Sequence, residues 1–153
     1  MRLGANWAMA LSIIAIVISI GALYYSYTSG KSIDSLRRAD QLPGSKWVLQ
    51  SLLVDGQQVS IPANVKVTIE FEGNMTRGNG PCNRYFGSYE VKGNVISFGP
   101  IGSTKMFCQE VMELESEYFS ALGKVGTISG TSNSLQLSSK DKETVLVFAV
   151  LQA

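Results

Sequence analysis

Apolar and polar residues alternate with a period of two along most of residues 45–150, which is typical of half-buried β-strands. The clearest run is VKVTIEF (residues 65–71), in which every second residue is apolar. Residues 46–54 predict a first strand with Trp47 in the core, and residues 72–78 predict a turn. Two hairpins are predicted from residues 88–91 with 95–98, around a tight Gly93–Asn94 turn, and from residues 135–139 with 144–150.

One segment, residues 110–122, has the spacing of a helix instead. Val111, Leu114, Tyr118 and Leu122 fall on one side of that helix, and Gly123 follows as a stop. Its acidic residues gather in the N-terminal half, where they suit the helix dipole. The strands, helix and strands predict an α+β fold: a curved antiparallel sheet of about seven or eight strands packed on one helix.

The N-terminal part of the chain predicts a membrane segment that precedes this domain. Residues 7–25 carry no charge, and a helix of this length rises about 28 Å, close to the thickness of the bilayer core. Trp7 at one end and three tyrosines at the other fit an aromatic belt. We therefore expect a transmembrane anchor in residues 1–27 that contacts the lipid bilayer through residues 7–25, a juxtamembrane linker in residues 28–44, and a globular domain in residues 45–153.

Two aspects of the membrane segment stay open at this point. A cleaved signal sequence is the alternative to an anchor, although residues 26–30 offer only weak small-residue cleavage sites. Lys31, Arg37 and Arg38 after the segment favour a cytoplasmic domain, whereas a disulfide would favour an exported one.

Charge and composition exclude several classes of function. The formal net charge is +1, with basic residues scattered singly, so we expect no nucleic-acid binding. The chain has no histidine, which excludes Ser–His–Asp and Cys–His nucleophiles and leaves a zinc site short of ligands. Glu113 and Glu117 share a helix face, but such charges are more typical of a solvated surface. We therefore expect no catalytic residues, no metal and no cofactor.

The two cysteines, Cys82 and Cys108, allow three interpretations. A structural disulfide would close a loop that contributes roughly 3 to 4 kcal/mol to the free energy of unfolding. Two buried free thiols are the second possibility. Redox chemistry is the third, with Arg84 or Lys105 lowering a thiol pKa, but neither a CxxC motif nor a general base accompanies the cysteines. The structural disulfide is the favoured interpretation.

The stretch GNGPCNRYFGSY (residues 78–89) resembles the G-C-N-x-[FY]-x-G-x-Y signature of the META domain (HslJ-like) family. The segment TKMFC (residues 104–108) resembles the family's second signature, T-x-M-x-C, and residues 115–122 resemble the helix that follows it. Pro81 and Phe107 depart from the usual pattern. Besides the cysteines, the motif residues are Gly80, Asn83, Gly87, Tyr89, Thr104 and Met106.

This resemblance implies a small α+β domain, without established catalytic activity, that commonly follows export signals and is linked to stress. It favours an extracytoplasmic location on a single-pass membrane protein. The leading hypothesis is therefore a membrane-anchored, non-enzymatic envelope module that binds an unknown protein or small ligand.

Arg84, Tyr85 and Phe86 are the predicted contact surface, because arginine and aromatic residues dominate binding hot spots. The simpler alternative places Tyr85 and Phe86 in the core. An inhibitor of an extracellular hydrolase, such as a lysozyme or protease, is the second functional hypothesis, and a thiol-redox protein is the third. Asn74 begins a glycosylation sequon on a predicted turn.

Overall fold

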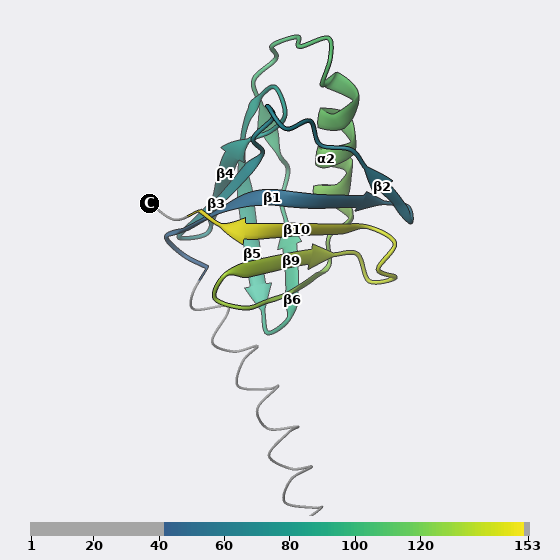
Figure 1. Cartoon of the computed structure of the whole chain (residues 1–153). Coiled ribbons are helices and arrows are strands. Elements are labelled where there is room, and N and C mark those ends of the chain that lie inside the picture. Colours follow the sequence, from purple (N-terminus) through teal and green to yellow (C-terminus); the bar gives the residue numbers. More distant parts are fainter. Residues whose placement is uncertain (1–41, 152–153) are drawn as a thin grey trace, which may run out of the picture. The chain divides into compact units, whose positions relative to one another are not determined.

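The computed structural model describes residues 42–151 of the chain (Figure 1). This range contains ten strands and one helix, α2 (Met112–Lys124), which follows β7 along the chain. The strands are β1 (Ser45–Val54), β2 (Gln57–Val59), β3 (Thr68–Glu72), β4 (Met75–Asn79), β5 (Arg84–Lys92), β6 (Val95–Phe98), β7 (Gly102–Ser103), β8 (Thr127–Gly130), β9 (Ser134–Ser138) and β10 (Val145–Val150).

Eight of these strands form a sheet that closes on itself, in the order β1-β3-β4-β5-β6-β8-β9-β10. The ring closes because β1 pairs with β10 along one edge and with β3 along the other. The remaining two strands are short additions: β2 pairs with the end of β1, and β7 pairs with the start of β5. All the strand pairs in this sheet are antiparallel.

The predicted α+β architecture, a curved antiparallel sheet of about seven or eight strands packed on one helix, is therefore wrong, since the sheet closes on itself and two short strands add to its ring of eight. Alternation along a sequence shows which side chains face the core, but it does not show which strands are neighbours. The closing contact joins distant parts of the chain, with Trp47 opposite Val150. The predicted turn over residues 72–78 is also too long, because Gly73, with φ of 57°, makes a tight turn and β4 begins at Met75.

The helix α2 packs its apolar side into the core that the closed sheet surrounds. Leu114, Tyr118 and Leu122 are buried, as the helical spacing predicts, and the helix continues through Gly123. Trp47 is buried as predicted. The loop between β7 and α2 lies at one end of the domain and the β5–β6 turn at the other (Figure 1). The largest fully buried side chains include Tyr85, Tyr118, Phe71 and Phe148.

The transmembrane helix predicted in residues 1–27, and most of the linker predicted in residues 28–44, lie outside the described residues. Within residues 42–151 no helix has both the length and the apolar character needed to cross a bilayer.

Candidate functional site

The signature stretch, residues 78–89, runs from the end of β4 through a turn into β5, where its side chains point alternately into the core and out to solvent. Tyr85 is only 2% exposed, whereas Phe86 is 60% exposed and Arg84 is also exposed. The predicted contact surface is thus divided: Arg84 and Phe86 lie on the outer face, and Tyr85 belongs to the core. The alternation of a strand makes this division unavoidable for three consecutive residues.

On the inner face, Tyr85 takes part in a buried hydroxyl chain. Its hydroxyl donates to the carbonyl of Thr68 at 3.0 Å and lies 2.7 Å from the hydroxyl of Tyr118 on α2. Because the Tyr85 proton goes to Thr68, Tyr118 is the donor between the two tyrosines. Burial is the main cause that raises the pKa of both hydroxyls above the usual value for tyrosine.

Asn83, which is 2% exposed, holds the segment after β7 through its side-chain amide. Its Oδ1 accepts hydrogen bonds from the Thr104 hydroxyl and from the Met106 backbone N–H, both at 2.7 Å. Its Nδ2 donates to the Met106 carbonyl at 3.1 Å and to Oε1 of Glu115 at 2.6 Å. One buried amide therefore connects β5, the segment after β7, and α2.

Glu115 is the buried anchor of this network, a role that was not predicted from the sequence. Its Oε2 accepts the backbone N–H groups of Cys82 at 2.9 Å and Asn83 at 2.6 Å. Gly80 leaves room for the carboxylate, since a Cβ there would lie 3.2 Å from the same oxygen. The available signal was the position of Glu115, three residues before Tyr118 on the apolar side of a predicted helix.

The cysteines are the covalent part of the same connection. Cys82 and Cys108 form a disulfide with a Cα–Cα distance of 5.9 Å, and residues 42–151 contain no free cysteine. The bridge fixes the end of the segment that Asn83 holds by hydrogen bonds at Thr104 and Met106. We call residues 104–108 the pinned loop.

The side chains of the pinned loop point outward although its backbone is held. Phe107 is 79% exposed and Met106 is 55% exposed, so the signature position Met106 is fixed through its backbone alone. Lys105 is also exposed and, like Arg84, it makes no ion pair with the residues that the structure describes. Arg84 lies directly beside this loop, because its backbone bonds to Thr104, whereas Phe86 lies further along β5, opposite Gly102 of β7.

Two further signature residues, Gly87 and Tyr89, have packing roles on β5. A Cβ on Gly87 would overlap the side chain of Ile101, so close approach rather than positive φ explains this glycine. The Tyr89 hydroxyl donates to the Gly73 carbonyl at 2.9 Å. The Tyr89 ring packs edge-on against the Phe71 ring, with 4.8 Å between the ring centroids.

The two glutamates considered for catalysis lie elsewhere on α2. Glu113 is exposed and Glu117 is half-buried, and both line a cleft beside the β1–β2 hairpin. Within residues 42–151 no group of three histidine, cysteine or carboxylate side chains is placed to hold a metal ion.

Comparison with known proteins agrees with the signature. The family model of the META domain matches residues 40–151, which is most of the chain. The chain belongs to the META domain family. Among proteins with curated descriptions, none matches it.

Several solved structures share this META fold. An NMR structure of a protein from Burkholderia xenovorans is 26% identical, with a TM-score of 0.64 over 75% of this chain and 87% of that one. A second NMR structure is 25% identical, with a TM-score of 0.56 over 73% and 93%. A DUF4847 family protein from Bacteroides vulgatus is 16% identical and, with a TM-score of 0.55 over 72% and 94%, shares the fold alone.

Proposed function

We propose that this META domain is a non-enzymatic binding module of the cell envelope and that the pinned loop, with Arg84 and Phe86, is its contact surface. One observation carries the proposal: Phe107 and Met106 remain exposed on a backbone that a disulfide and Asn83 hold in place. A rigid element loses little conformational freedom on binding, and aromatic side chains next to arginine supply much of the energy in protein interfaces.

The envelope location is supported by two features of the chain. The uncharged segment of residues 7–25 is long enough to attach the protein to a bilayer as a helix. The Cys82–Cys108 disulfide fits the oxidising surroundings outside the cytoplasm. A role under envelope stress, which the family resemblance implies, would make binding conditional on such stress.

The binding proposal is tested by capture from cells with the full-length chain, with partners identified by mass spectrometry. We expect Arg84→Ala and Phe107→Ser to lose partners that the native chain retains. The matched control is Val95→Ser, since Val95 is 50% exposed at the start of β6, and the β5–β6 turn beside it lies at the other end of the domain. Identical partner sets for all four chains would overturn the proposal. A hydrolase among the lost partners would indicate the inhibitor alternative, which activity assays on that enzyme then decide.

The location is tested on intact cells with a maleimide that does not cross membranes, with and without a reductant. Labelling that needs reductant but not lysis is expected for an exported domain with a Cys82–Cys108 bridge. Labelling that needs lysis but not reductant would overturn the extracytoplasmic location.

A further inference from the structure

A cleft lies beside the N-terminal half of α2, the part of the helix that follows the pinned loop along the chain. It has a volume of about 540 Å³, within the range of protein ligand sites. The β1–β2 hairpin forms one wall and the first half of α2 the other, with Val54, Val59 and Leu114 as its apolar part. Its acidic lining residues are Asp55, Glu110, Glu113 and Glu117.

The charges of this cleft are mostly uncompensated. Asp55 pairs with Lys124 at 2.7 Å, whereas Glu110, Glu113 and Glu117 make no ion pair with the described residues. Carboxylates gathered around a concave, partly apolar surface attract a cationic group more strongly than isolated surface charges do. The cleft therefore fits a protruding element that carries both a positive charge and an apolar side chain.

The pinned loop is an element of that kind on the same chain. It presents Lys105 beside Phe107, and Cys108 lies only two residues before Glu110 of the cleft. The loop does not fill its own cleft, because the disulfide and Asn83 hold it with Phe107 79% exposed. The pinned loop and the cleft thus complement each other and lie next to each other, but they do not contact each other within one molecule.

We infer that the occupant of this cleft is the pinned loop of a second copy of the chain. The inference rests on the proposed function and names the partner of the same contact surface. Lys105 of each copy meets Glu113 of the other, and Phe107 packs beside Leu114. Because projection and hollow are neighbours, one two-fold axis forms both contacts at once, and the result is a closed dimer rather than an open chain.

A charge-exchange experiment on the full-length chain, purified in a non-ionic detergent, tests this dimer by sedimentation velocity over a dilution series. In a Lys105→Glu dimer, both contacts bring like charges together, and the same is true of Glu113→Lys. Like-charge contacts cost several kcal/mol, so each variant alone is expected to raise the dimer dissociation constant at least about tenfold. An equal mixture of the two variants restores opposite charges at both contacts, and we expect dimers to return.

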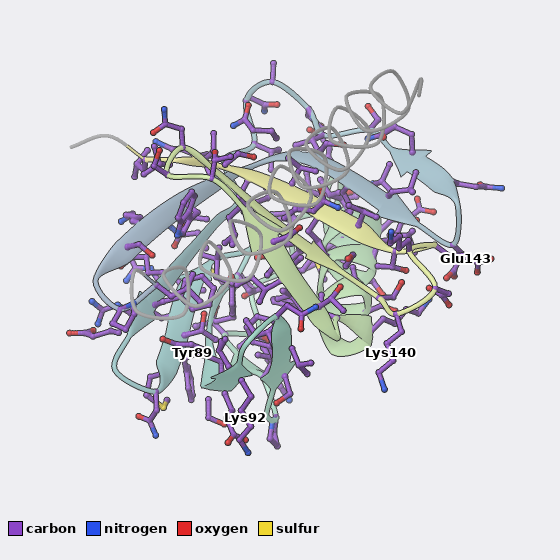
Figure 2. The ribbon with its side chains drawn as sticks, turned by 90° about the horizontal axis from the view of Figure 1, so that it is seen from below. Tyr89, Lys92, Lys140 and Glu143 are labelled. Carbon is purple, nitrogen blue, oxygen red and sulfur yellow. A yellow bond between two sulfur atoms is a disulfide. The ribbon has the colours of Figure 1, made fainter. Side chains whose placement is uncertain are left out.

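The matched control is Glu143→Lys, which makes the same charge change in the β9–β10 turn, where the exposed Glu143 and Lys140 extend away from the ribbon (Figure 2). This variant is expected to dimerise as the native chain does. A native chain that stays monomeric at every concentration, or a mixture that fails to recover, overturns the inference. If Phe107→Ser still abolishes capture of a different protein, the proposed function stands without the dimer. If changes in the loop alter neither sedimentation nor capture from cells, the dimer and the proposed function both fail.

Discussion

The inward-facing and outward-facing residues of the signature segment differ in burial and in hydrogen bonding. Inward-facing Asn83 and Tyr85 have their polar atoms bonded to neighbouring strands and to α2, whereas outward-facing Arg84 and Phe86 contribute little to the core. Four consecutive residues, 83–86, therefore combine a scaffold and a surface. The difference teaches that the fixed positions of a family signature can determine the fold, while the variable residues between them determine which surface is offered to a partner.

The strongest way to break the inner face is to remove its buried carboxylate. Glu115→Ala leaves three donors without their acceptor, so we expect the free energy of unfolding to fall by about 3–5 kcal/mol. Urea titration followed by circular dichroism measures this change. Glu113→Ala, two residues away and exposed, should stay within about 0.5 kcal/mol of the native value. Equal effects of the two changes would show that the network contributes nothing.

Removal of the disulfide tests how much the Cys82–Cys108 bridge contributes to the free energy of unfolding. The sequence separation of 26 in the bridge predicts a loss of about 3–4 kcal/mol in the Cys82→Ala/Cys108→Ala double variant, from the greater freedom of the unfolded chain. Urea titrations of the native chain with and without reductant provide a second estimate. A double variant as stable as the oxidised native chain would contradict the prediction.

The two tyrosines should respond unequally, although they differ from phenylalanine by the same hydroxyl. Tyr85→Phe removes the donor to Thr68 and the acceptor of Tyr118, and should cost about 1–3 kcal/mol. Tyr118→Phe removes only one donor and should cost about 1 kcal/mol. Thermal and urea unfolding measure both values, and the opposite order would show that the proton positions are assigned wrongly.

Alkaline pH should destabilise the inner face further. Burial raises the pKa of Tyr85 and Tyr118, so both stay protonated in the folded state when an unfolded tyrosine, with a pKa of about 10, begins to ionise. Their contribution is complete below about pH 10 and is lost above it, by up to about 1.4 kcal/mol per pH unit for each tyrosine. Unfolding midpoints measured across this range should fall less steeply in Tyr118→Phe than in the native chain.

The outer face should show the smallest effect on stability. Phe107→Ser removes a ring that is already in solvent, and we expect a change within about 0.5 kcal/mol. The same variant should lose its binding partner. A large loss of stability would show that the ring belongs to the scaffold, and the comparison between the two faces would then fail.

The strands and the helix were largely predictable because their patterns are local. The hairpin around Gly93 is confirmed, with φ of 62° at the glycine, and the helix is displaced by only two residues. Closure of the sheet was not predictable, since the pairing of β1 with β10 depends on the arrangement of every strand between them.

The site was predictable in its positions but less so in its roles. The cysteine pair was predicted as a disulfide and Asn83 was identified from the signature, whereas Tyr85 was left between the predicted contact surface and the core. Glu115 was overlooked because an acidic residue near a helix start has an ordinary explanation in the helix dipole. Its place on the apolar side of the helix indicated burial, but its partners are two backbone groups and an amide from a segment more than thirty positions earlier, and a local pattern does not identify such partners.

The way Asn83 holds the pinned loop has a consequence for protein design. Its bonds to residue 106 reach only backbone atoms, and the carboxylate of Glu115 likewise meets the backbone of residue 82. The side chains at positions 105, 106 and 107 are thus free to change without altering how the loop is held. The domain is a natural frame for displaying a short variable peptide, in which recognition can diversify while the fold is inherited unchanged.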